Sequence, residues 1–253
     1  MTITAVQVGG TATDSATSAS RTTASNVTAG NLVVIPVCTY KPGDDPFVVG
    51  DITESGTATF TGGFSLDIQR NQDNGGSDFS NVVVFSAICT GTGTGIFTVG
   101  GAPAGSYWNV SVGEFSSDVG WGADRLEDTA SSEGTTGAPS STDGTSADKA
   151  LFIGILGTET TGATTHTHDA AFTIIDEEED GSNHMTGSAI YQIAAGGTTD
   201  SASWTAPTTV AWAAALAVYK ETAPVGGDEI RIFWPSNLDG IGTGGPFPGH
   251  RVS

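Results

Sequence analysis

The chain carries the same strand pattern at two distant places. Residues 28–38 read TAGNLVVIPVC, and residues 145–156 read TSADKALFIGIL. In both stretches small polar residues and a polar turn precede an unbroken apolar run. The run is short, and in the first copy it is rich in β-branched residues, which favours a buried strand over a helix. This repeated strand pattern predicts a duplicated β-structure.

Further segments extend the repeat along most of the chain. Residues 10–38 align without a gap with residues 128–156, and the later pairs are 64–73 with 172–180, 82–94 with 188–200, and 107–115 with 211–219. In the last pair Trp108 matches Trp212. The period of roughly 105–118 residues is too long for a solenoid repeat and has the size of one small β-sandwich.

Alternation of apolar and polar residues predicts the strands of the first half. They are expected at residues 3–8, 31–40, 58–60, 64–69, 81–90, 95–99 and 107–115. Clusters of Gly, Asn, Asp and Pro separate them, as tight turns require. Pro36 lies inside the second of these strands and has no N–H to donate, which predicts a bulge or a sheet edge there.

These patterns predict an all-β protein of two tandem β-sandwich repeats, jelly-roll or Ig-like, with an extended arm. The first repeat is expected at residues 1–120 and the second at residues 121–222. A Gly/Pro-rich C-terminal arm follows at residues 223–253. The alternative is one larger pseudo-symmetric sandwich whose layers share strands of both copies, and the sequence leaves both open.

The arm is the part of the chain that has no copy. It is rich in glycine and proline, yet it carries apolar side chains that a solvated tail would expose. We therefore predict that it docks on the protein itself or on a neighbour. The predicted partner-binding residues are Ile230, Ile232, Phe233, Trp234, Phe247 and Arg251, together with Trp121, which also lies outside the repeat.

The charge balance limits the partners. The chain has 28 acidic residues against 8 Lys plus Arg, a formal net charge of −20. The basic residues are scattered singly, whereas a surface that binds phosphate groups needs them clustered. Nucleic acid and an anionic membrane surface are therefore not expected as partners. No apolar run reaches the length of about 18 residues typical of a membrane span, and the first residues do not resemble a secretory signal.

The cysteines and histidines allow a structural and a chemical interpretation. Cys38 and Cys89 are either two small buried hydrophobic residues, which we favour, or one disulfide on neighbouring strands. In the repeat alignment they match Leu156 and Ala195.

His166 and His168 have a spacing that suits two zinc ligands on a strand, with His184 as a possible third. A polar loop beside a strand is the favoured interpretation.

Acidic residues offer no clear catalytic or metal site. Residues 176–180 are five consecutive acids, which suit calcium, but a solvated hairpin tip is favoured. Glu114 lies inside a predicted strand, where its counterpart is Val218, and is a weak candidate for a catalytic carboxylate. No nucleophile elbow, phosphate loop or zinc-protease motif is present. We therefore expect no enzyme activity, cofactor or metal.

The tryptophans could stack on sugars. Trp108 and Trp212 occupy matching strand positions, which favours a role in the core for both. Trp121 and Trp234 lie outside the repeat and are better candidates for binding a partner.

The order of motifs resembles the duplicated β-sandwich structural proteins of tailed bacteriophages. The resemblance rests on TAGNLVVIPV, on VVFSAI and AIYQIA, and on WNVSVGEF and WAAALAVYK, and it covers roughly residues 5–220. It implies a virion component on the outer surface of a capsid or tail: a capsid decoration (cement) protein, or a tail or fibre protein that binds a surface glycan. The implied partners are the major capsid protein or other virion proteins, and a homo-oligomer is expected.

Overall fold

The structure is a computed structural model that describes most of the chain before the arm. The described residues are 2–42, 46–73, 75, 78–159, 165–179, 185–206 and 208–222. The predicted arm at residues 223–253 lies outside them, and with it the six predicted partner-binding residues that it carries. His184 and Trp234 also lie outside the described residues.

The first half of the chain is built from strands and one short 3-10 helix at Val49–Asp51. The strands are β1 (Ile3–Ala16), β2 (Ala19–Thr22), β3 (Leu32–Pro42), β4 (Ile52–Glu54), β5 (Ser65–Asp73), β6 (Asp78–Ile88), β7 (Ile96–Val99) and β8 (Ser106–Ser117).

The second half is built from strands alone. They are β9 (Leu126–Gly134), β10 (Gly144–Ser146), β11 (Ala150–Glu159), β12 (Thr167–His168), β13 (Thr173–Glu179), β14 (Met185–Ala194), β15 (Thr198–Asp200), β16 (Trp204–Thr205) and β17 (Trp212–Lys220). The described residues contain no α-helix, which confirms the predicted all-β class.

Two five-stranded antiparallel sheets form the centre of the molecule. Sheet 1 has the order β1-β8-β3-β6-β5, and sheet 2 has the order β9-β17-β11-β14-β13. Each strand of sheet 2 therefore holds the place of the strand that the sequence repeat matches to it. The domain boundaries at residues 120 and 222 stay a prediction.

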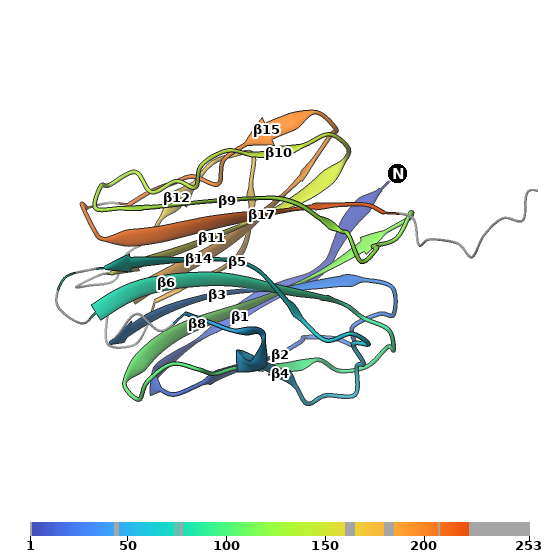
Figure 1. Ribbon diagram of the computed structural model, residues 1–253, viewed down its shortest axis with the longest axis horizontal. Helices are drawn as coiled ribbons and strands as arrows, with labels where there is room; N and C mark the ends of the chain where they lie inside the picture. Colours follow the sequence, from blue (N-terminus) through green and yellow to red (C-terminus); the bar gives the residue numbers. More distant parts are fainter. Residues whose placement is uncertain are drawn as a thin grey trace, which may run out of the picture.

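The molecule has four layers, with sheets 1 and 2 as the inner pair (Figure 1). A three-stranded sheet of β2, β7 and β4 covers the outer face of sheet 1, and the small pairs β10-β15 and β12-β16 cover sheet 2. Three cores fill the spaces: a central core between sheets 1 and 2, and one outer core on each side. Phe115 of sheet 1 and Tyr191 of sheet 2 meet edge to face in the central core, with ring centroids 5.3 Å apart.

Most predicted strands of the first half are present, with three differences. Residues 58–60 form only an isolated bridge, from Thr59 to Gly91, so the strand predicted there is wrong. The short strands β2 and β4 were not predicted. Pro36 lies in β3, a central strand, and neither a bulge nor an edge occurs at it. Instead the pairing of β3 with β8 is interrupted between Val34 and Val37, where Pro36 has no N–H to donate.

The ungapped alignment of residues 10–38 with 128–156 is wrong in register. Cys38 faces the central core, but Leu156 faces the outer core of sheet 2. Because successive strand residues point to opposite faces, a shift of one position exchanges the two sides. Leu32 and Leu151, which both face the central core, are the equivalent pair, and this places Gly157 opposite Cys38 in the repeat.

The two cysteines lie on opposite faces of sheet 1. Cys38 is part of the central core and Cys89 is part of the outer core, both are buried, and no disulfide joins them. The favoured interpretation as two small buried hydrophobic residues is confirmed, and the alternative disulfide is wrong.

Sheets 1 and 2 approach each other closely at two glycines of sheet 2. A Cβ atom on Gly187 would lie 2.3 Å from the Cys38 sulfur, and one on Gly157 would lie 3.1 Å from the Cys38 Cβ and 3.2 Å from a Val82 methyl carbon. The side chains of Cys38 and Val82 in sheet 1 therefore lie against two glycines of sheet 2, which have no side chain beyond a hydrogen atom. This match of large and small side chains allows the sheets to pack without a gap.

We expect Gly187→Ala to destabilise the protein by about 1–3 kcal/mol, because the added methyl group overlaps both Cys38 and Asn109. The measurement is the free energy of unfolding in urea. In Gly187→Ala, the further change Cys38→Ala should restore part of the loss by removing the sulfur. Gly50→Ala is the control, since a Cβ there meets nothing within 4 Å. Equal stability of all three variants would contradict this account of the contact.

Candidate functional site

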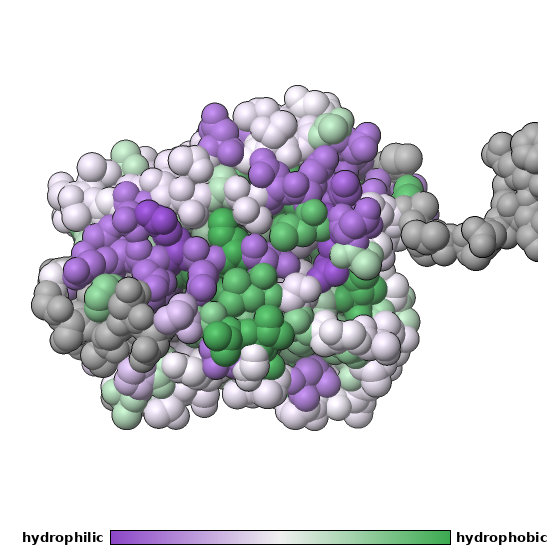
Figure 2. Space-filling view, in the orientation of Figure 1, coloured by the Kyte–Doolittle hydropathy of each residue, from purple (hydrophilic) through white to green (hydrophobic). Residues whose placement is uncertain are grey.

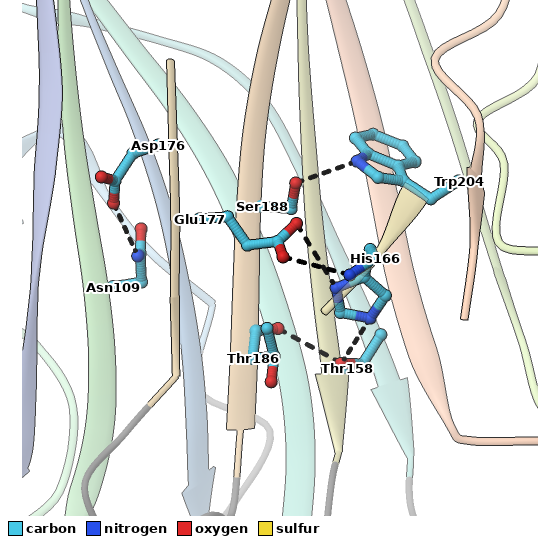
Figure 3. Close-up of polar contacts among 8 residues, drawn as sticks. All are labelled: Asn109, Thr158, His166, Asp176, Glu177, Thr186, Ser188 and Trp204. Carbon is cyan, nitrogen blue, oxygen red and sulfur yellow. Dashed lines mark hydrogen bonds and ion pairs between the residues drawn. The ribbon is translucent and has the colours of Figure 1, made fainter. Parts of the chain in front are cut away.

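His166 is the centre of a buried polar cluster on the outer face of sheet 2. The residue lies just before β12, and only 4% of its surface is exposed. Its Nε2 atom lies 3.2 Å from the Thr158 hydroxyl oxygen of β11, and its backbone N–H donates to a Glu177 carboxylate oxygen of β13 at 3.1 Å. Figure 3 shows the ring between the side chains of Glu177, Thr158 and Trp204. The cluster therefore ties the loop before β12 to the strands of sheet 2.

The second ring nitrogen of His166 and the second oxygen of Glu177 face each other without a hydrogen bond. The atoms are 3.9 Å apart, beyond hydrogen-bond length. Burial lowers the pKa of His166 from 6.5 to about 4, so the ring is neutral near pH 7. Burial also raises the pKa of Glu177, although the His166 backbone N–H acts against this.

The alternative interpretation of His166 and His168 as two zinc ligands is not supported by their positions. The His166 ring is buried, whereas His168 is half-buried and its Nδ1 lies 2.9 Å from the Asp169 carbonyl oxygen. Across the described part of the chain, no group of three or more His, Cys, Asp or Glu residues is placed to hold a metal ion. His166 and Glu177 alone offer two ligands, and a structural zinc site takes four.

The acidic run that begins at Asp176 is part of a strand rather than a hairpin tip. Residues 176–179 belong to β13, the edge strand of sheet 2, and pair with β14. Asp176 points to sheet 1, where it accepts a hydrogen bond from the Asn109 amide at 3.1 Å, and burial raises its pKa. Glu177 points the other way, to His166. The first two acids of the run therefore connect layers.

Glu114, the weak catalytic candidate, is completely buried in β8. One carboxylate oxygen accepts from the Thr28 backbone N–H at 2.8 Å and from the Asn31 amide at 2.6 Å. The other accepts from the Gln7 amide at 2.5 Å. All three partners are donors, so the carboxylate holds β1 and the loop before β3 against β8 and has no place for a substrate.

The described tryptophans are buried. Trp108 and Trp212 lie in the two outer cores, which confirms the core role predicted for both. Trp121, a predicted partner-binding residue, is 5% exposed in the central core and donates its ring N–H to the Phe115 carbonyl at 3.1 Å. Its ring covers the end of the central core and offers no binding surface on this chain.

A shallow hollow lies beside β4 on the outer face of the first half. It has a volume of about 320 Å³ and is lined by Val49, Ile52, Glu54, Phe60, Phe64 and two glycines. Phe60 and Phe64 are half-buried, with ring centroids 5.2 Å apart. Figure 2 shows hydrophobic residues gathered in this region, where Figure 1 draws β4 and the 3-10 helix. Aromatic faces beside one carboxylate suit a small ligand with apolar and hydroxyl groups.

The comparisons with known proteins give no relative. The chain matches no protein-family model, no curated protein and no solved structure. No helix in the described ranges has the length and apolar character needed to cross a membrane.

Sequence reasoning missed the hollow and the buried network of Glu114. The hollow combines residues from β4, the 3-10 helix and the turn before β5, and their proximity depends on how the short strand β4 pairs with β7. Glu114 carried a usable signal, since a single acid in an apolar strand requires several donors when it is buried.

The lowered pKa of His166 predicts acid sensitivity. The unfolded chain binds a proton at His166 below about pH 6.5 and the folded chain only near pH 4, so this residue lowers stability as the pH falls between these values. At about pH 5 we expect a loss of about 2 kcal/mol relative to pH 7. His166→Gln, which keeps a group near Thr158 and does not titrate, should lack this loss in urea unfolding.

The comparison between wild type and His166→Gln removes an opposing effect. Burial raises the pKa values of Asp67, Asp176 and Glu177, so these carboxyls add stability as the pH falls through their folded pKa values. Both proteins contain them. Parallel pH profiles for the two proteins would show that His166 does not cause the loss.

Proposed function

We propose that this protein is a non-enzymatic structural protein of a virion, a capsid decoration (cement) protein that stabilises the shell by binding across subunits. The observation that carries the proposal is the use of the buried polar side chains. Glu114 joins β1 to β8, Asp176 joins sheet 2 to sheet 1, and His166 joins β12 to β11. These groups stabilise a four-layer scaffold and do not converge on a cleft.

The shape and charge of the chain also support this role. A rigid β-structure with a net charge of −20 resists non-specific association and can cover a surface as a spacer. The resemblance to duplicated sandwich proteins of tailed phages supports a place on the outer surface of a capsid or tail. The major capsid protein or another virion protein is then the partner.

Attachment in this proposal uses the arm at residues 223–253. The four-layer scaffold sits on a preformed protein lattice, and the arm crosses to an adjacent subunit. A contact of about 1,600 Å² is sufficient for specific attachment, and repetition over a lattice multiplies its effect. The anchors are the apolar residues Ile230, Ile232, Phe233, Trp234 and Phe247, with Arg251 as a charged contact.

Deletion of residues 223–253 should abolish incorporation into particles. The melting temperature of the purified shortened chain is measured alongside, so that a loss of folding is told apart from a loss of attachment. The measurement is the occupancy of the protein on purified particles, together with the temperature at which the particles lose their contents. The double variant Phe233→Ser, Trp234→Ser tests the aromatic anchors without shortening the chain. Unchanged occupancy of both variants would contradict the proposal.

A second candidate function is a carbohydrate-binding adhesin of a tail or fibre. The hollow beside β4 favours it, because Phe60 and Phe64 present ring surfaces next to the Glu54 carboxylate. Sugars bind by stacking their apolar faces on aromatic rings while their hydroxyl groups reach carboxylates.

A glycan array separates the two functions. Under the adhesin hypothesis the intact chain binds a defined set of glycans, and Phe60→Ala with Glu54→Gln abolishes the signal. Val48→Ala, a change at a 56% exposed residue that does not line the hollow, is the control and should bind as the unchanged protein does. Absence of binding to any glycan would contradict the adhesin and leave the decoration protein.

A further inference from the structure

One edge of sheet 1 is open for strand pairing. In the described part of the chain, β1 pairs with β8 on one side and with no strand on the other. At Gly9 and Gly10 the Arg21 guanidinium and the Asp176 carboxylate lie against the strand, so the open part is residues 3–8. An unpaired edge presents backbone N–H and C=O groups that can pair with another chain.

This open stretch is unlike the other three edges of the two inner sheets. The strands β5, β9 and β13 contain the charged sequences SLDIQRNQD, LEDTASSEG and TIIDEEE. Residues 3–8 of β1 read ITAVQV and contain no charge. Natural edges are commonly protected by charged side chains, and β1 lacks this protection where it is open.

Aliphatic side chains are exposed at this edge. Val6 is 46% and Val8 is 38% exposed on β1, and Ile174 is 41% exposed on β13, which packs beside β1. They are three of the five large hydrophobic residues exposed in the described chain. Val6 is the extra residue of a bulge, and the bulge in β9 at the corresponding place contains Glu127. The same bulge is apolar in one half and charged in the other.

The described chain ends beside the start of β1. Thr222 donates its backbone N–H to the Gly120 carbonyl at 3.3 Å, and Glu221 accepts from the Ser117 hydroxyl at 2.6 Å. Ser117 is paired with Ile3, the first residue of β1. The segment that follows Thr222 therefore starts at the end of the open edge.

That segment contains one strand-like sequence. Residues 229–234 read EIRIFW, in which Ile230 and Ile232 alternate with Arg231 and Phe233. The eight residues from Thr222 to Ile230 span at most about 28 Å when extended. The strand-like sequence matches the open edge in length, since each has six residues. Arg231 also adds a positive charge, which suits an acidic protein surface.

We propose that residues 229–234 of one copy add as a strand to residues 3–8 of β1 in a second copy. The added backbone hydrogen bonds extend sheet 1, and Ile230 and Ile232 cover Val6 and Val8. This is recognition by strand addition, in which the main chain supplies affinity and alternate side chains supply specificity.

A second copy fits the edge better than the same chain. The chain leaves at the start of β1, so its own arm runs in the same direction as β1 and pairs with it in parallel unless residues 223–228 reverse the chain. Every strand pair of sheet 1 is antiparallel, and parallel pairing is slightly less stable per residue. An arm from a neighbour can enter from the far end and pair antiparallel.

The contact between copies is independent of a virion. It requires only this chain, so it is tested on purified protein. Variants that lose self-association but keep their place on particles would support this contact and contradict the attachment role proposed for the arm. Variants that associate normally but do not reach particles would contradict this contact between copies and support the attachment role of the arm.

The experiment measures self-association of the full chain by analytical ultracentrifugation over a range of concentrations. We expect association that weakens at least about tenfold in Val6→Glu, Val8→Glu and equally in Ile230→Glu, Ile232→Glu. The control Val48→Glu, Val49→Glu places two charges at residues that are 56% and 49% exposed away from the edge, and it should associate as the unchanged protein does. Hydrogen exchange should show protection of residues 3–8 that disappears on dilution.

Cysteine cross-linking identifies the strand that pairs with β1. When chains with Val6→Cys are mixed with chains with Ile232→Cys and treated with a mild oxidant such as oxidised glutathione, which accepts the two electrons, a disulfide should form between chains. The native cysteines are buried and should not compete. Three results would overturn the proposal. The first is a monomer at every concentration, and the second is association that is insensitive to both pairs of charges. The third is a single chain with Val6→Cys and Ile232→Cys that cross-links only within itself.

Discussion

The close contact between sheets 1 and 2 determines how the rest of the molecule is arranged. Cys38 and Val82 of sheet 1 lie against Gly157 and Gly187 of sheet 2. If two copies of sheet 1 faced each other, their larger side chains at this place would overlap. If two copies of sheet 2 faced each other, the glycines would leave a cavity. Both arrangements would destabilise the protein. At this contact the two halves are complementary, and both contribute residues to the central core.

Polar side chains between the inner sheets fix their orientation. The Tyr219 hydroxyl of sheet 2 donates to the Asp67 carboxylate of sheet 1 at 2.6 Å, and the Arg125 guanidinium donates to the Ser86 hydroxyl at 2.8 Å. Asp67 is the extra residue of the bulge in β5, where the equivalent bulge in β13 contains the buried Ile175. One half thus uses a hydrogen bond where the other uses an apolar contact. Such buried bonds favour one relative placement of the sheets, because a shifted sheet would break the bond between Tyr219 and Asp67.

The sequence predicted the strands better than the register. Alternation and turn residues located β3, β5, β6 and β8, because local pattern is sufficient for a strand. The alignment that paired Cys38 with Leu156 matched letters, but the face of each residue depends on which layer covers it. His166 was predicted in a polar loop, and its burial depends on Trp204, which is brought beside it by the pairing of β12 with β16. Contacts of this kind between distant segments leave no local signal in the sequence.

The charges on the edge strands of the two inner sheets support the proposed assembly with other chains more directly than the fold does. A chain with 28 acids has ample charge to protect every edge, and β5, β9 and β13 carry some of it. The open residues of β1 carry none, although the corresponding bulge of β9 contains Glu127. An uncharged edge with exposed Val6 and Val8 favours pairing with another chain. Since the buried polar groups hold the layers together, this edge and the arm that begins beside it are the parts of the molecule best suited to contact a partner.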